Sequence, residues 1–438
     1  MSDLLLSNIG QLVTCDQSFH VGSGIHADPA FSQLGVLKQA AVVTEKGKIA
    51  WLGQQAELPE RFRNYPALDV TGRLVLPGLV DCHTHVVFGG NRANEYTLRA
   101  QGKSYMEIAE SGGGIKRSVA LTRAASFESL YFEARERLLR MMECGSTVIE
   151  VKSGYGLDLE TEIRQLEVIK ALNQELAIEL VPTFLGAHEV PPEFLLDGKK
   201  DEQLTGRYLD FVIAEVLPIV ESRGLAKFCD VFCEQGVFSK EQARLVLEAG
   251  QRRGLIPRIH AEELSFAGGS ELAAELGAAS ADHLMEITPA AIRQMVEAGV
   301  VFVLLPGTTV FLGKGKFAPA REIISAGGVV ALATDRNPGS CTAESLVLIA
   351  TLACSNMHLT PGEAILAITK HAAQALRLEH EVGTISPGMR GDFAIFDLHD
   401  YQELPYNFGV NLLSGLIVRG EVQISAALPQ GSGGGCCG

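Results

Sequence analysis

Length, composition and charge set the first limits on what this chain can be. It has 438 residues, 47% hydrophobic and 20% charged, and its formal net charge is −15. This composition is that of a globular protein, with enough apolar residues for two ordinary domains or for one large barrel with an appendage. The negative charge argues against nucleic acid and anionic membrane surfaces as partners, but a local Arg or Lys could still hold a small acidic substrate.

Targeting signals and cysteine spacing indicate where the protein is located and whether disulfides or structural zinc hold it together. The N-terminal residues show no secretory signal, and no run approaches the roughly 18 apolar residues of a membrane span, so we expect a cytoplasmic protein with no membrane partner. The nine cysteines are odd in number and form no CxxC pair, which predicts neither a disulfide framework nor a structural zinc site. The low-complexity residues 429–438, "PQGSGGGCCG", are expected to be a flexible tail.

The two ends of the chain are both predicted to be β-rich. Residues 38–55 read as two apolar strands around the turn-forming "EKGK", and short β runs with glycine-containing turns return at 382–400 and 412–425. We expect residues 1–75 and 379–428 to meet in one small β-sandwich domain.

The middle of the chain, residues 76–378, alternates short apolar strands with amphipathic helices. Eight strands ending in polar residues favour a (β/α)8 TIM-like barrel over an open doubly wound sheet. No Gly-x-Gly-x-x-Gly turn opens a helix after the first strand, which also argues against a dinucleotide-binding fold. The expected strand ends are "GLVDCHTH", "TVIEVKSGYG", "LVPTFLGAHE", "FCDVFCEQG", "LIPRIHAEE", "AASADHL", "VVFVLLPGTT" and "VVALATDRNPG".

Titratable and polar side chains gather where these strands end, which is where the active site of such a barrel lies. In chain order they are His83 and His85, Tyr155, His188, Glu234, His260 and Glu263, Asp282 and His283, and finally Asp335 and Asn337.

Four of these residues predict a metal site. His83 and His85 are one residue apart on an extended strand, so both imidazoles should enter the same space while Cys82 and Thr84 point away. With His260 and Asp335 at the same barrel mouth, the donor set suits one divalent or trivalent ion, zinc or iron. Such an ion activates water for hydrolysis at neutral pH.

Two further residues are candidates for moving protons and stabilising charge. Glu263, in "RIHAEE", could accept and return a proton, with its neighbour Glu262 as a rival. Extended backbone would place Glu263 on the side opposite His260, so this role requires a turn after the strand. His283 could bond the attacking water or the substrate oxygen. The glycine run 112–114 lacks the ending of a P-loop and is expected to be a loop over the barrel mouth.

The chain resembles the amidohydrolase superfamily over nearly its whole length. The motifs that carry the resemblance are "HTHVVFGGNR", "ESGGGI", "EVKSGYGL", "FLGAHEVPPE", "RIHAEE", "SADHL", "LLPGTT" and "ATDRNPGS". The resemblance implies the same barrel and terminal β-sandwich, one catalytic zinc or iron, and a homodimer. Cys82 and Arg336 are regarded as variable positions, although Arg336 would alter the local charge. The implied metal ligands are His83, His85, His260 and Asp335, the implied catalytic residues are Glu263, His283 and Asp335, and the implied substrate contacts are Arg92, Tyr155, His188, Glu263, Asn337, Gly339 and Ser340.

The activity that the resemblance implies is hydrolysis of a cyclic amide, 4-imidazolone-5-propanoate, to N-formimino-L-glutamate, the third step of histidine degradation. The planar guanidinium of Arg92 would bind the propanoate carboxylate. Two alternatives are a related deaminase acting on a nucleobase-like cyclic amidine, which would share the metal ligands, and a scaffold protein without activity. The scaffold is disfavoured because the ligand set is complete.

Overall fold

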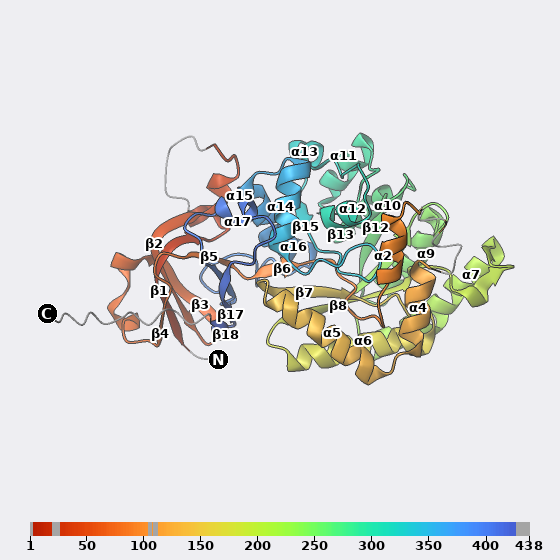
Figure 1. Cartoon of the computed structure of the whole chain (residues 1–438), viewed down its shortest axis with the longest axis horizontal. Helices are drawn as coiled ribbons and strands as arrows, with labels where there is room; N and C mark the ends of the chain where they lie inside the picture. Colours follow the sequence, from red (N-terminus) through yellow and green to blue (C-terminus); the bar gives the residue numbers. More distant parts are fainter. Residues whose placement is uncertain (1–2, 20–26, 104–106, 108–112, 426–438) are drawn as a thin grey trace.

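The computed structural model describes residues 3–19, 27–103, 107 and 113–425, and these form two parts that lie side by side (Figure 1). One part is a barrel of parallel strands surrounded by helices, and the other is a sheet built from both ends of the chain. Among the described residues, no helix is both long and apolar enough to cross a membrane.

The eight strands of the barrel pair in chain order, and every pair is parallel. The ring is closed by a parallel bridge between Thr84 and Arg336, just beyond the first and last strands. The predicted (β/α)8 barrel is therefore confirmed. Its strands are β6 (Leu79–Asp81), β7 (Ser146–Lys152), β8 (Glu179–Ala187), β11 (Phe228–Cys233), β12 (Ile256–Ala261), β13 (Ser280–His283), β14 (Val301–Leu304) and β15 (Val330–Leu332).

The helices pack their apolar faces on the outside of this ring, and several begin at a side-chain cap. Asp158 accepts a hydrogen bond from the Thr161 N–H, and Ser239 and Gln242 form a capping box. The helices of the barrel are α2 (Ala93–Ala100), α4 (Ile115–Ala124), α5 (Phe127–Met142), α6 (Leu159–Glu175), α7 (Glu202–Phe211), α8 (Leu217–Ser222), α9 (Lys240–Gln251), α10 (Gly269–Leu276), α11 (Pro289–Ala298), α12 (Pro306–Phe311), α13 (Ala320–Ser325), α14 (Leu346–Met357), α15 (Pro361–Ala367) and α16 (Lys370–Ala375).

The terminal sheet joins strands that are more than 300 residues apart in the sequence. C-terminal β16 runs antiparallel to N-terminal β5, with Ala394 opposite Leu76. All eight terminal strands are linked in one sheet, which confirms that the two ends meet. They are β1 (Leu4–Val13), β2 (Val36–Glu45), β3 (Lys48–Gln54), β4 (Ala67–Asp69), β5 (Leu74–Pro77), β16 (Phe393–Phe396), β17 (Leu413–Val418) and β18 (Glu421–Ser425).

The terminal sheet is attached at the amino ends of the barrel strands. Gly78 separates β5 from β6, and a Cβ at this position would lie 2.2 Å from Thr147 Oγ1, so only glycine fits this crossing. Arg390, from the terminal part, pairs with Asp392 and with Glu179 at the start of β8. The carboxyl ends of the strands, where the titratable residues lie, are therefore on the side of the barrel away from the terminal sheet (Figure 1).

Candidate metal centre and active site

Three imidazoles converge at the mouth of the barrel. The Nε2 atoms of His83 and His85 are 3.3 Å apart, and Nε2 of His260 lies 3.4 Å from that of His85. Burial lowers the pKa of His83 and His85 well below their ordinary values, with further contributions from the charges of Lys152 and His188 respectively. Both imidazoles are therefore neutral, the form that binds a metal ion.

Asp335 brings a fourth donor to this cluster. Its Oδ1 atom is 3.6 Å from Nε2 of both His83 and His85, while its Oδ2 accepts a hydrogen bond of 2.5 Å from the Thr308 hydroxyl. A tetrahedral ion with bonds of about 2.0–2.1 Å holds its ligand atoms about 3.4 Å apart. The spacing of the three histidine nitrogens thus fits a divalent metal ion, and Asp335 lies beside two of them. Without a cation, burial raises the pKa of the Asp335 carboxyl to about 7, and a bound ion would hold it ionised.

Buried carboxylates fix the orientation of two of the imidazoles. His83 Nδ1 lies 2.6 Å from Asp282 Oδ2, and His260 Nδ1 lies 3.1 Å from Asp230 Oδ1. An N–H at Nδ1 that donates to a carboxylate leaves the lone pair on Nε2, which is the atom facing the other ligands. This arrangement is the usual support of a metal-binding histidine.

A buried lysine and arginine balance these carboxylates. Lys152 Nζ is 2.9 Å from Asp230 and 2.8 Å from Glu150, and Arg258 donates to Asp282 at 3.1 Å. Although burial opposes it, His260 and Lys152, each of which donates to the Asp230 carboxylate, hold its pKa well below the usual range. These buried ion pairs therefore fix Asp230 and Asp282, which in turn orient His260 and His83.

Cys82, which precedes the first histidine, and Thr84, which lies between the two, are both outside the metal cluster. Cys82 packs among apolar barrel residues such as Val80 and Val148, and burial raises the pKa of its thiol well above the ordinary value. The Thr84 hydroxyl donates to the Glu150 carbonyl at 2.6 Å. Cys82 is consequently neither a reactive thiolate nor one of the clustered donor groups.

The turn that Glu263 requires after its strand is present at Glu262. Glu262 has a φ of 52°, in the left-handed region that non-glycine residues seldom adopt. Its carboxylate turns away from the metal cluster and accepts hydrogen bonds from the N–H groups of Gly269 and Ser270, where α10 begins. His283 and Asp335 also have positive φ, so strained backbone gathers at this site. The geometry favours Glu263 over its rival.

Glu263 faces two nitrogen groups, one at each carboxylate oxygen. Its Oε2 lies 3.9 Å from His283 Nε2 and its Oε1 lies 3.6 Å from Lys314 Nζ. Burial would raise the pKa of Glu263, but the neighbouring His283 ring and the Lys314 ammonium outweigh it and hold the pKa below the usual value. His283 itself has its pKa lowered to about 4 by burial. Glu263 is therefore an ionised base with a partner at each oxygen.

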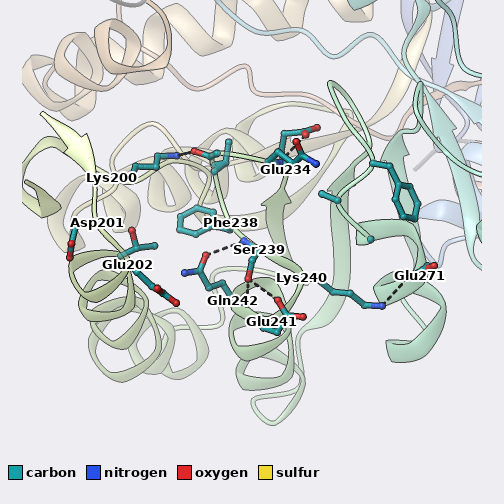
Figure 2. A pocket seen from close by; sticks show the side chains of 17 residues that line it. Lys200, Asp201, Glu202, Glu234, Phe238, Ser239, Lys240, Glu241, Gln242 and Glu271 are labelled. Carbon is teal, nitrogen blue, oxygen red and sulfur yellow. Dashed lines mark hydrogen bonds and ion pairs between the residues drawn. The ribbon is translucent and has the colours of Figure 1, made fainter.

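Glu234 holds the loop that carries Glu263. Its carboxylate accepts hydrogen bonds from the N–H groups of Leu264 (2.8 Å) and Ser265, and from the Ser265 hydroxyl. Figure 2 shows Glu234 on the wall of a pocket near Lys200, with Lys240 and the other residues at the start of α9 across from it. Glu234 is buried, and its carboxylate oxygens hold the backbone directly after Glu263 in place.

Tyr155 and His188 lie beside the metal cluster. The His188 ring stacks on His85 with centroids 5.3 Å apart, and the Tyr155 ring is 5.8 Å from His85 and 5.4 Å from His188. His188 Nδ1 donates to the Gly154 carbonyl at 2.9 Å, and burial lowers the pKa of the ring to about 3. Both side chains can border a small ring bound at the metal.

Arg92, Gly339 and Asn337 form a second group at the rim. Arg92 Nε and Nη2 donate to Glu95 at 3.0 and 2.7 Å, and a Cβ at Gly339 would lie 2.1 Å from Arg92 Nη1. Asn337 Oδ1 accepts from the N–H groups of Gly339 and Ser340 at 2.8 and 2.7 Å. The absence of a side chain at position 339 therefore lets Arg92 lie against the turn that follows Asp335.

The expected glycine-rich loop is described only in part. Gly112 lies outside the described residues, whereas the Gly114 N–H donates to Glu95 at 3.2 Å. Glu95 is buried and thus connects Arg92 to this loop. The Arg336 guanidinium, one residue after Asp335, donates from Nε to Glu344 at 3.0 Å.

Comparison with known proteins identifies the family. The family model described as "Amidohydrolase family" matches residues 165–422. Imidazolonepropionases of Geobacillus sp. (strain WCH70) and Geobacillus kaustophilus (strain HTA426) are 44% and 48% identical to the chain, and the alignments cover 97% and 90% of it and 99% and 92% of those proteins. The chain belongs to the imidazolonepropionase family of amidohydrolases.

Solved structures with the same fold come from more distant amidohydrolase-like enzymes. A triazine hydrolase variant superposes with a TM-score of 0.74 at 17% identity, covering 97% of this chain and 95% of that chain. An adenosine deaminase from Xanthomonas campestris with bound zinc gives 0.71 at 17%, covering 97% and 93%. At such low identity the likeness shows the fold alone, and the imidazolonepropionase relatives carry the closer assignment.

Sequence reasoning missed several residues of this imidazolonepropionase family site. Charged residues within the apolar strands "TVIEVK", "FCDVFC" and "IPRIHA" were a usable signal, because a buried charge needs a partner. Glu95 lies three residues after Arg92 at the start of α2, a helical spacing that also indicates a pair, whereas Lys314 meets Glu263 only through the arrangement of loops. The missed residues are Glu95, Glu150, Lys152, Asp230, Arg258 and Lys314.

Proposed function

We propose that this chain hydrolyses the cyclic amide of 4-imidazolone-5-propanoate to N-formimino-L-glutamate, the third step of histidine degradation. One arrangement supports the proposal. The three histidines and Asp335 lie together, and Arg92 packs against Gly339 in the turn that follows Asp335. The neutral imidazolone ring needs a group that polarises its carbonyl, and the propanoate carboxylate needs a cationic partner. The mouth of the barrel offers a metal site for the first and Arg92 for the second.

We infer that His83, His85, His260 and Asp335 hold one zinc or iron ion. Three imidazoles and a carboxylate suit either metal. When bound, the ion supplies Lewis-acid chemistry, polarising the amide carbonyl and lowering the pKa of water. Metal analysis of the purified protein distinguishes the two metals.

The remaining residues bind and orient the substrate. The Arg92 guanidinium is expected to take the propanoate carboxylate, while Glu95 fixes the position of that guanidinium through Nε and Nη2. Tyr155 and His188 would border the imidazolone ring. Asn337, Gly339 and Ser340 form the turn against which Arg92 lies and are expected to contact the propanoate group, while the hydrogen bonds from the Gly339 and Ser340 N–H groups to Asn337 Oδ1 hold this turn in shape.

The proton transfers are assigned to Glu263 and His283. Glu263 is expected to take a proton from the attacking water, whose oxygen bonds to the carbonyl carbon, and to deliver that proton to the ring nitrogen as the C–N bond breaks. His283, 3.9 Å from Glu263, would stabilise the negative oxygen that develops on the carbonyl. The water is thereby added across the broken bond.

Loss of imidazolone absorbance on adding the protein, with and without a chelator, tests this function. Arg92→Ala should raise KM strongly, about 100-fold, because it removes the only proposed charge partner of the carboxylate. Unchanged turnover of imidazolone propanoate by Arg92→Ala would contradict Arg92 as the carboxylate anchor, whereas absence of turnover by the wild-type protein would contradict the assignment and favour the deaminase alternative, which needs no carboxylate anchor.

The partner and location expectations remain predictions. The substrate is a small molecule, and neither nucleic acid nor a membrane is expected to bind. The homodimer rests on the sequence resemblance, and light scattering after gel filtration would give the mass of the assembly. The cytoplasmic location stays an expectation that cell fractionation can test.

A further inference from the structure

The loop that follows β7, residues 153–157, is held by a buried carboxylate of α6. The N–H groups of Gly154, Gly156 and Leu157 all donate to Glu162, at 3.1, 2.8 and 2.8 Å. Glu162 lies in the first turn of α6, and its side chain is buried against this loop. We refer to residues 153–157 as the Tyr155 loop, because they carry Tyr155 to its place beside His85.

The Tyr155 loop has a backbone shape that local preference does not favour. Gly154 has a φ of 106° and Leu157 has a φ of 55°, both in the left-handed region. A Cβ at Gly156 would lie 2.5 Å from the backbone nitrogen of Glu162, so a side chain at this position would collide with α6. The hydrogen bonds to the Glu162 carboxylate therefore stabilise a conformation that the loop would not keep alone.

A second side chain of α6, Gln165, holds the peptide group between Gly154 and Tyr155. Its Oε1 accepts a hydrogen bond of 3.2 Å from the Tyr155 N–H, and its Nε2 donates to the Val87 carbonyl at 2.7 Å. Because one partner is a donor and the other is an acceptor, only this orientation of the amide satisfies both. Gln165 is fully buried, so its amide fixes the direction of this peptide group.

The same peptide group orients His188. Its carbonyl, that of Gly154, accepts a hydrogen bond from His188 Nδ1 at 2.9 Å, while its N–H is the one that donates to Gln165. Two hydrogen bonds and one peptide group thus connect α6 to His188, and hydrogen bonds in such a chain strengthen one another. A Cβ at Gly154 would lie 3.0 Å from His188 Nδ1, so the glycine allows this close approach.

The orientation of His188 determines what its other ring nitrogen can do. In a neutral imidazole whose Nδ1 carries the proton, the lone pair is on Nε2, which can only accept a hydrogen bond. The His188 ring stacks on His85, beside the proposed metal ligands. A ligand ring that lies at the metal and carries an N–H group would therefore find a matching acceptor in His188.

We propose that Gln165 and Glu162 are positioning residues that fix His188 as a hydrogen-bond acceptor for a ring N–H group of the substrate. The inference rests on the proposed function for the identity of this ring, which in an imidazolone carries N–H. Both residues act on the ligand through the Tyr155 loop, so their loss should weaken substrate binding rather than slow the chemical step.

Steady-state kinetics separate these two effects. Gln165→Met removes both hydrogen bonds of the amide and should raise KM about tenfold, with kcat and bound metal near wild type. Gln174→Met is the matched control, because Gln174 lies exposed on the same helix. A wild-type KM in Gln165→Met, an equal rise in both variants, or a fall in kcat together with metal content overturns the proposal.

A spectroscopic measurement tests the positioning without the reaction. Long-range proton–nitrogen NMR spectra of protein labelled in its histidine nitrogens distinguish the two neutral forms of an imidazole, and the His188 signals are those missing in His188→Gln. Wild type and Gln174→Met should carry the proton on Nδ1, whereas Gln165→Met should show a mixture of both forms. A proton on Nε2 in wild type, or an unchanged spectrum in Gln165→Met, overturns the proposal; absence of imidazolone turnover alone refutes only the proposed function.

Glu162 supplies an independent variant. Glu162→Gln keeps one accepting oxygen but turns an amide N–H towards the N–H groups of the Tyr155 loop. KM should therefore rise roughly threefold, and the His188 spectrum should shift towards the mixture. Glu160→Gln removes the same charge from the same helical turn, where Glu160 is exposed and pairs with Arg164, and should behave as wild type. Wild-type KM and spectrum in Glu162→Gln overturn the proposal.

Discussion

At the scale of single residues, Lys314 distinguishes Glu263 from the other carboxylates of the barrel mouth. Glu262 and Glu234 accept hydrogen bonds from backbone N–H groups, so their role is to hold the chain. Glu263 instead faces the Lys314 ammonium and the His283 ring. Lys314 Nζ lies 3.6 Å from Glu263 Oε1 and has no hydrogen-bond partner among the residues that the structure describes, so its charge is directed at Glu263. We therefore expect Lys314 to keep Glu263 ionised and in place.

Lys314→Met should change the pH profile of the reaction. Because the Lys314 charge contributes to the low pKa of Glu263, its removal should raise that pKa. The base would then be protonated over a wider acidic range, so the acidic limb of the kcat/KM profile should move to higher pH. At neutral pH kcat should fall roughly tenfold, the usual order for a weakened general base. Steady-state rates between pH 5 and 9 would measure both effects.

Lys316 offers a control two residues away in the same loop. It is exposed and pairs with Glu286 rather than with Glu263. Lys316→Met should leave the pH profile of wild type unchanged. An acidic limb that stays in place in Lys314→Met would show that Lys314 does not tune Glu263.

The candidate metal ligands could be found from the sequence, but their supports could not be assigned. Alternation along a strand was enough to bring His83 and His85 together, because side chains two residues apart share a face. Pairing Asp230 with His260 requires knowing that β11 and β12 are neighbours in register, since Phe232 lies opposite His260. Long-range geometry of this kind is absent from a single sequence.

At the scale of elements, the loop after β12 is fixed on both sides of Glu263. Glu262 anchors the preceding backbone to the start of α10, and Glu234, at the end of β11, holds Leu264 and Ser265. Three separate elements therefore determine where one catalytic candidate lies. Small displacements of such a residue can reduce a rate by a large factor.

Glu234→Gln should reduce kcat about tenfold while KM and metal content stay near wild type, because the change loosens the loop without removing a metal ligand or a substrate contact. Glu271→Gln is the matched control, since Glu271 lines the same pocket in Figure 2 but pairs with Lys240. Rates measured together with metal analysis would separate the two roles. A normal kcat in Glu234→Gln would rule out this positioning role.

The regular elements of the barrel were predictable, whereas the irregular ones were not. The eight strands are short apolar runs with polar ends, and helices such as α5, α6, α9 and α11 have clear amphipathic periods. The short hairpin of β9 (Leu195–Leu196) and β10 (Lys199–Lys200) has two residues in each strand, too few to show an alternating pattern. The turn at Glu262 escapes prediction because local propensity disfavours a positive φ there, and only the surrounding hydrogen bonds stabilise it.

At the scale of the whole molecule, the proposed metal ligands lie on both sides of the junction between the first barrel strand, β6, and the last, β15. We call this junction, where the barrel closes, the seam. His83 and His85 follow the first strand, Asp335 follows the last, and His260 ends β12 on another part of the ring. The seam itself has few backbone bonds: the Asp335 N–H donates to the His83 carbonyl and the His85 N–H to the Arg336 carbonyl. An ion bound by these residues would therefore connect the first and last strands directly.

Removal of the metal should consequently loosen the seam more than the rest of the barrel. A ligand at about 100 times its Kd stabilises the folded state by about 2.7 kcal/mol, and chelation would withdraw that contribution. Hydrogen exchange measured by mass spectrometry should show faster exchange at residues 82–86 and 334–337 after chelation, with β8 and β11 less affected. Asp335→Asn, which weakens the link from the last strand, should show part of the same pattern before any chelator is added. Uniform acceleration over all eight strands would mean that the ion stabilises the barrel globally, and unchanged exchange at the seam would mean that the ion does not close it.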